Sequence, residues 1–241
     1  MLIRQPDGLI RFSIFERFAN LICRQTTRIW DSQNSINVNQ HQLKKLLKFL
    51  KLNPNSVYQM EQVHRINIAV IPNGPSRVPK SDGLITKNPN TYLLVQVADC
   101  LPLYFYNPKA QLVSVVHAGW QGVLRGIIPA ILEKWAAVGG KISQTYVAIG
   151  PHIGGCCYTI DEERVRIFQK PGFAEALYQQ DSRWHLDLGQ IVRLQLLTGG
   201  LLKENIDAPV SCTACQNDIY HSFRKARHQV GRMIGIIGVN A

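Results

Sequence analysis

Runs of apolar residues separated by short polar breaks occupy most of the chain and predict buried strands. Three consecutive core strands are expected at 91–100 (TYLLVQVADC), 101–107 (LPLYFYN) and 110–120 (AQLVSVVHAGW), which are rich in β-branched and aromatic residues. Residues 57–64 predict a short strand that ends at His64. Further strands are expected at 66–71, 144–151 and 231–240.

Helical periodicity appears between these strands. Leucines 43, 46, 47 and 50 follow the i, i+3, i+4, i+7 spacing of an amphipathic helix over 42–52. Residues 122–140 predict a second helix that ends at Gly-Gly, with a kink expected at Pro129. Two more helices are expected at 161–170 and 188–201.

Several neighbouring strands are joined by connections too short for a crossover helix, which favours a mixed sheet over a doubly wound parallel one. The sequence shows no internal repeat and no obvious linker. We therefore expect one α/β (α+β) domain that spans residues 1–241.

Composition narrows the class of partner. The 241 residues include 27 Lys and Arg and 16 Asp and Glu, so the formal net charge is +11. This excess favours anionic partners such as phosphates and nucleotides. No nucleic-acid-binding motif is present, and no apolar run has the length of a signal peptide core or a membrane span, so a cytoplasmic protein is expected.

Three metal-compatible side chains end apolar strands or lie next to their ends: His64, Cys100 and His117. Two imidazoles and one thiolate suit zinc, and three protein ligands are typical of a catalytic zinc site because the fourth position stays open. The same residues also fit a Cys100 nucleophile with His117 or His64 as its base, or a copper site. Seven histidines without an H-x-H pair disfavour a multicopper oxidase.

Glycines follow His117 where the chain passes from strand to helix. Gly119 and Gly122, with Gln121 between them, fit either an anion-binding turn or a turn that merely packs tightly. Near the C-terminus, Ser222 and Arg224 suit a phosphate or a ribose, although a solvated basic surface gives the same pattern.

The remaining cysteines lack a complete zinc motif. Cys156 and Cys157 are adjacent, and Cys212 and Cys215 form a C-x-x-C, whereas a zinc ribbon has two such pairs. We expect these four to be reduced thiols that hold neither a metal ion nor a disulfide.

Six segments together resemble the laccase-domain family, whose members are identified as polyphenol oxidases or as purine nucleoside phosphorylases with adenosine deaminase activity. They are EQVH (61–64), SDGLIT (81–86), VQVADCLPLYF (95–105), VVHAGWQG (115–122), AIGPHIGGCCYTI (148–160) and SFRKARHQVGRMIGIIG (222–238). The resemblance covers roughly residues 57–239.

The resemblance implies a layered sandwich of mixed sheets, similar to the fold of cysteine-deamidase toxins. It implies that His64, Cys100 and His117 hold zinc, or in some members copper. The implied reaction is phosphorolysis of adenosine, inosine or 5′-methylthioadenosine to the base and ribose 1-phosphate, with deamination of adenosine as a second activity. Zinc chemistry and an anion site are compatible with both.

The sequence also departs from the family pattern. The family turn reads H-A-G-W-R-G, but Gln121 replaces its arginine, and the family's Asn-Arg pair has no clear counterpart in NQHQLKK (39–45). A neutral glutamine binds phosphate less strongly than an arginine. A family member that binds metal or nucleoside without turnover is therefore the alternative.

Overall fold

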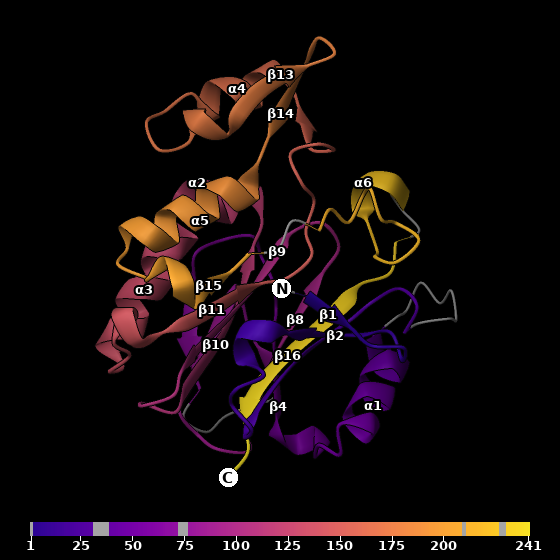
Figure 1. Ribbon diagram of the computed structural model, residues 1–241, viewed down its shortest axis with the longest axis vertical. Coiled ribbons are helices and arrows are strands. Elements are labelled where there is room, and N and C mark those ends of the chain that lie inside the picture. The colour runs from indigo at the N-terminus through magenta and orange to yellow at the C-terminus, as the bar shows by residue number, and fades with distance from the viewer. Residues whose placement is uncertain (1, 31–38, 72–76, 209–210, 227–229) are drawn as a thin grey trace.

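Two large mixed β-sheets lie face to face in the middle of the molecule, with helices on their outer sides (Figure 1). The computed structural model describes residues 2–30, 39–71, 77–208, 211–226 and 230–241. The first sheet consists, in spatial order, of β1 (Leu2–Arg4), β2 (Leu9–Phe12), β3 (Leu21–Thr26), β16 (Met233–Val239), β8 (Tyr92–Val97), β4 (Val57–Met60) and β6 (Arg77–Val78). Its central strand is the C-terminal one, β16, which pairs antiparallel with both β3 and β8.

The second sheet carries much of the site. In spatial order it consists of β15 (Ile206–Asp207), β11 (Tyr146–Ile149), β9 (Leu101–Asn107), β10 (Leu112–Ala118), β7 (Gly83–Thr86) and β5 (Ile68–Val70). The β5–β7 and β11–β15 pairs are parallel and the others are antiparallel. The expected layered fold with mixed sheets is thus confirmed.

Burial on both faces explains why the central strands read as continuous apolar runs. Along β9, Leu103 and Phe105 pack toward the helices, whereas Tyr104 and Tyr106 pack between the two sheets. Successive side chains of a strand point to opposite faces, so a strand covered on both sides has no polar face to show.

Helices α2 (Trp120–Arg125), α3 (Ile127–Ala137) and α5 (Leu188–Thr198) cover the second sheet, and α1 (Asn39–Phe49) covers the first. The single helix expected over 122–140 is two helices, and the break lies at Gly126 rather than Pro129. Gly126 adopts a left-handed φ of 92°, which glycine tolerates readily. Pro129 lies in the first turn of α3, where its missing N–H removes no intrahelical hydrogen bond.

A small third sheet projects beyond the two large ones, at the top of Figure 1, together with helix α4 (Glu162–Phe168). It is formed by β12 (Thr159–Ile160), β14 (Arg183–Leu186) and β13 (Leu177–Gln180). The last helix is the short α6 (Phe223–Ala226). In the described part of the chain, no helix is long and apolar enough to span a membrane.

Two expected strand ends differ in the structure. Strand β4 ends at Met60, and His64 lies in the following turn with a left-handed φ of 57°. Cys100 lies between β8 and β9, which belong to different sheets. Strands β1 to β3, β6, β7 and β12 to β15 were not expected, and all of them except β3 have two to four residues.

Close packing between the two large sheets leaves no room for a side chain at Gly235 of β16. A Cβ atom there would lie 1.9 Å from the hydroxyl of Tyr104 in the facing sheet. We predict that Gly235→Ala lowers the free energy of unfolding by about 1–3 kcal/mol through overpacking, measured by urea denaturation. In a double-mutant cycle, Tyr104→Phe should reduce this cost, because it removes the closest atom. Strictly additive effects would contradict the packing argument.

Candidate metal centre and substrate pocket

His64, Cys100 and His117 converge on one point, although they lie far apart in the sequence. The ligand atoms of the three side chains lie within 4.8 Å of one another, and Cys100 Sγ is 4.0 Å from His64 Nε2. In a tetrahedral zinc site, a sulfur and a nitrogen ligand lie about 3.6 Å apart. The donor set and its spacing therefore fit a zinc ion after a small contraction, and the histidine–cysteine set also fits copper.

Strand register explains the convergence. In the antiparallel β7–β10 pair, Val116 is opposite Gly83, so His117 lies beside Asp82. In the β9–β10 pair, Ala118 is opposite Leu101, which brings Cys100 to the same end of the sheet. Placement of His117 and Cys100 thus follows from the pairing of three strands.

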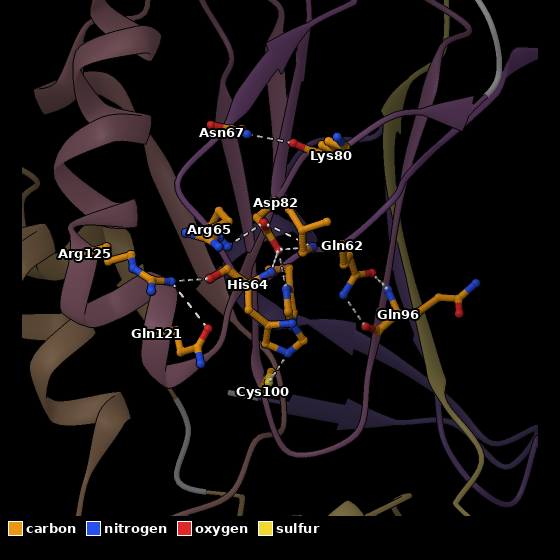
Figure 2. Close-up of polar contacts among 12 residues, drawn as sticks. Gln62, His64, Arg65, Asn67, Lys80, Asp82, Gln96, Cys100, Gln121 and Arg125 are labelled. Carbon is orange, nitrogen blue, oxygen red and sulfur yellow. Dashed lines mark hydrogen bonds and ion pairs between the residues drawn. The ribbon is translucent and has the colours of Figure 1, made fainter. Parts of the chain in front are cut away.

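A buried carboxylate, Asp82, holds both histidines in place, and Figure 2 shows it beside the turn that carries His64 and Arg65. Asp82 Oδ1 is 2.8 Å from Nδ1 of His117 and accepts a hydrogen bond from the backbone N–H of His64 at 2.9 Å. Its Oδ2 accepts from the backbone N–H of Arg65 at 2.7 Å. A carboxylate at Nδ1 keeps the proton on that nitrogen and leaves Nε2 of His117 available as a ligand.

Hydrogen bonds outweigh desolvation at Asp82. Burial alone raises the pKa of this carboxyl, but the contacts with His117 and with the backbone N–H groups of Arg65 and His64 bring the pKa below its usual value. Asp82 therefore stays ionised. A buried charge with this many donors is stable where an unpaired one costs several kcal/mol.

Cys100 and His117 form a polar pair. Burial raises the pKa of the Cys100 thiol, but His117 and His64 outweigh it and bring the pKa to about 6. Burial lowers the pKa of His117, whereas Cys100 and Asp82 raise it to about 9. A thiolate and an imidazolium are thus mutually stabilised, and a bound metal ion would take the place of the proton on Nε2.

Gly119 permits the approach of the three ligands. A Cβ atom there would lie 2.8 Å from Cδ2 of His64 and 3.2 Å from Sγ of Cys100. Gly122 packs its α-carbon against the backbone oxygen of Arg65, with 3.1 Å to a Cβ atom added there. For both glycines the contacts support the tight-packing alternative, and no contact tests the anion-binding one.

Gln121 lies one turn before Arg125 on helix α2. The Arg125 guanidinium contacts Gln121 Oε1 and the backbone oxygen of His64, both at 3.4 Å (Figure 2). A positive charge therefore lies beside the neutral residue that replaces the family arginine.

A cavity of about 430 Å³ opens beside the three ligands. Its apolar wall includes Trp120, Tyr158 and Phe223, and its polar wall includes Gln62 and Gln96. The side-chain amide of Gln62 donates to the backbone oxygen of Gln96 at 2.8 Å and accepts from its backbone N–H at 2.9 Å. The size and the aromatic lining suit a flat heterocycle.

Two arginines, Arg224 and Arg232, give the cavity a positive side. Arg224 donates from its guanidinium to Thr159 Oγ1 at 2.8 Å and to the Thr159 backbone oxygen at 3.0 Å. Its backbone N–H donates to Asp99 Oδ2 at 2.6 Å. The structure thus places Arg224 at the same cavity as the three ligands.

Four of the five other cysteines also converge, which the sequence analysis did not expect. The Sγ atoms of Cys156, Cys157, Cys212 and Cys215 all lie within 4.8 Å of one another. All six cysteines of the chain carry free thiols. The absence of a second C-x-x-C was therefore not a sufficient reason to expect that the four thiols form no cluster.

Sequence reasoning missed Asp82 and Asp99 as site residues. Asp82 stands in the quoted segment SDGLIT, directly before the short apolar run that forms β7, so its place in that segment was the available signal. Asp99 precedes Cys100 and has a left-handed φ of 87°, held by hydrogen bonds from Thr213 and Arg224. No sequence pattern indicates those two long-range partners.

Comparison with known proteins agrees with the motifs. Residues 21–240 match the sequence profile of the family described as Multi-copper polyphenol oxidoreductase laccase. Purine nucleoside phosphorylase YlmD of Bacillus subtilis is 35% identical over 163 residues, which cover 66% of this chain and 59% of that protein. Purine nucleoside phosphorylase YlmD of Geobacillus stearothermophilus is 36% identical over 192 residues, which cover 74% and 70%. The match thus spans less than two thirds of the Bacillus subtilis protein.

A solved structure shares the whole fold. The crystal structure of YlmD from Geobacillus stearothermophilus superposes with a TM-score of 0.88 at 29% identity, covering 100% of this chain and 99% of that one.

The Asp82–His117 contact generates a test. We predict that Asp82→Asn weakens zinc binding by about 10- to 100-fold, because the variant loses the charge that orients and polarises the imidazole. Competition with a chromogenic chelator measures the affinity, and circular dichroism checks the fold. Ser81→Ala, one residue away, should retain wild-type affinity. Unchanged zinc affinity in folded Asp82→Asn protein would exclude this role.

Proposed function

The chain belongs to the family of multi-copper polyphenol oxidoreductase laccases, and we propose that it is a metal-dependent purine nucleoside phosphorylase. The two YlmD proteins to which it is similar are named purine nucleoside phosphorylase. The observation that carries the proposal is the juxtaposition of the His64–Cys100–His117 set with an aromatic cavity that also contains two arginines.

The cavity offers separate places for the parts of a nucleoside. Trp120, Tyr158 and Phe223 provide aromatic surface for the purine. Gln62 and Gln96 provide amide groups for its polar edge, and two hydrogen bonds with the Gln96 backbone fix the side chain of Gln62. The proposed substrates are adenosine, inosine and 5′-methylthioadenosine.

Phosphorolysis joins a phosphate oxygen to C1′ of the ribose and breaks the bond between C1′ and the purine nitrogen. The bonding electrons leave with the purine, which takes up a proton, and ribose 1-phosphate forms. Arg224 and Arg232 would bind and orient the phosphate, since guanidinium groups form charge-assisted hydrogen bonds with its oxygens. Gly119, Gln121 and Gly122 complete the proposed anion side of the site, and Arg125 adds charge beside Gln121.

His64 Nε2, Cys100 Sγ and His117 Nε2 would hold the metal, zinc or alternatively copper. A bound zinc ion supplies a Lewis acid at the cavity wall. Asp82 fixes the tautomer of His117. Gly119 has no side chain and therefore lets His64 and Cys100 approach each other. We therefore propose that Cys100 and His117 are catalytic residues, because they would hold the metal that takes part in the reaction.

Deamination of adenosine is the proposed second activity of the same site. In this reaction water replaces the amino group at C6 of the purine, and ammonia leaves. The donor set favours it, because a site with three protein ligands is typical of catalytic rather than structural zinc. Deamination needs no phosphate, so the two activities are separable by their products.

The test follows the products of adenosine in the presence and absence of phosphate. We predict adenine only with phosphate, inosine under both conditions, and loss of both products after chelation or in His64→Ala. Zinc should restore the chelated wild type but not the variant. Chromatography quantifies the products, and metal analysis quantifies the zinc.

Other outcomes point to the alternatives. Zinc and adenosine binding without any product would indicate a binding protein and overturn the proposal. Turnover that survives metal removal but is lost after alkylation of Cys100 would favour the cysteine nucleophile instead.

Gln121 allows a test of the anion side. We predict that Gln121→Arg lowers the phosphate concentration for half-maximal phosphorolysis by at least about fivefold, because a charged donor replaces a neutral one and adds about 1–3 kcal/mol. Deamination should change little. Phosphate dependence of the initial rate measures the effect.

Gln180→Arg is the matched control, since it adds the same charge on exposed strand β13 of the projecting sheet. It should leave the phosphate dependence unchanged. An unchanged dependence in Gln121→Arg as well would show that residue 121 does not face the phosphate.

A further inference from the structure

Four thiols gather where two distant segments of the chain meet. Sγ of Cys215 lies 3.4 Å from Sγ of Cys156 and 3.3 Å from Sγ of Cys157, and Cys212 completes the set within 4.8 Å. A tetrahedral zinc ion with bonds of 2.3 Å to sulfur separates its ligands by about 3.8 Å. The observed spacing brackets this value.

The backbone holds the two segments together independently of the thiols. His152 and Cys212 form an isolated parallel bridge, in which the N–H of Thr213 donates to the His152 oxygen at 3.0 Å. A tight turn follows on the first segment, because the N–H groups of Cys157 and Tyr158 both donate to the Gly154 oxygen at 3.0 Å. This turn brings the adjacent thiols 156 and 157 to one side, so the pair replaces a second C-x-x-C.

Backbone N–H groups surround one sulfur in the manner of a metal knuckle. Cys212 Sγ accepts hydrogen bonds from the N–H groups of Gly154, Ala214 and Cys215. The last two lie two and three residues after Cys212, so the C-x-x-C segment curls back on its first thiol. Such donors compensate part of the negative charge of a thiolate, which is the form that binds metal.

Gly154 allows the two cysteine-bearing segments to pack closely. A Cβ atom there would lie 3.3 Å from both Sγ of Cys156 and Cβ of Cys212. A larger residue would push the two segments apart.

We propose that Cys156, Cys157, Cys212 and Cys215 bind a second zinc ion, in a four-thiolate site distinct from the His64–Cys100–His117 centre. Zinc displaces the thiol protons to solvent, and no electron is transferred. Four protein ligands close the coordination sphere, which makes the site structural. This replaces the sequence-based expectation that the four cysteines hold no metal, and it does not depend on the proposed function.

The second site borders the substrate cavity. Thr213, inside the C-x-x-C segment, donates to Asp99, the neighbour of Cys100. The backbone oxygen of Cys157 accepts from the Arg224 guanidinium at 3.3 Å, and Tyr158 forms part of the cavity wall. A zinc ion in this position would hold the wall that carries Arg224.

Metal counting tests the proposal. Protein purified under reducing conditions from zinc-supplemented cells should contain two zinc ions per chain, and Cys215→Ser should contain one. Cys100→Ser should also retain one, and the double variant none. The matched control Cys23→Ala removes a thiol buried elsewhere, in strand β3, and should keep both.

Cobalt provides a second measurement that does not rely on the loss of a ligand from the cluster. In apo Cys100→Ser, the His64–His117 pair has no thiolate left, so thiolate-to-cobalt charge-transfer absorption reports only on the four-cysteine site. We expect one equivalent of cobalt to produce this absorption. Its absence, an unchanged zinc content in Cys215→Ser, iron in place of zinc, or a disulfide within the cluster under reducing conditions would each overturn the proposal.

Discussion

The carboxylate of Asp82 is the interaction on which the geometry of the site depends. One fully buried charge accepts hydrogen bonds from the turn that carries His64 and contacts the ring of His117. Removal of such a charge from water is costly unless donors replace the lost hydration. The turn after β4 therefore forms with its N–H groups directed at Asp82, and His64, in a left-handed conformation, is placed beside His117 as a result.

The sandwich of two sheets positions Cys100, the third metal-compatible side chain, and the cavity. The chain leaves the first sheet after β8 and enters the second at β9, and Cys100 lies at this passage. Asp99, just before it, keeps a left-handed backbone that few non-glycine residues adopt without support. Hydrogen bonds from Thr213 and from the backbone of Arg224 provide that support. The passage between the sheets is thereby tied to the C-terminal part of the chain.

These hydrogen bonds hold two clusters of metal-compatible side chains close together in one region of the molecule. Asp99 connects the segment of Cys100 with the C-x-x-C segment, and Arg224 contacts both the backbone of Cys157 and the cavity. In the proposed enzyme, the second zinc ion would then stabilise the wall that orients phosphate. The chemistry at the first metal and the rigidity around it would come from different cysteines of the same chain.

The sequence by itself determined the fold class, the core strands and the first set of metal-compatible side chains. Apolar runs identified β8, β9, β10 and β16 because strands covered on both faces carry no polar alternation. The types of His64, Cys100 and His117, next to such runs, limited the chemistry to a few options. The tertiary structure alone decided what depends on contacts between distant segments. Strand register placed Asp82 against His117, and a turn at Gly154 curled an adjacent cysteine pair toward Cys215. Neither contact leaves a local pattern, because hydrogen bonds to a buried carboxylate and the meeting of two thiol-bearing turns are set by packing rather than by spacing along the chain.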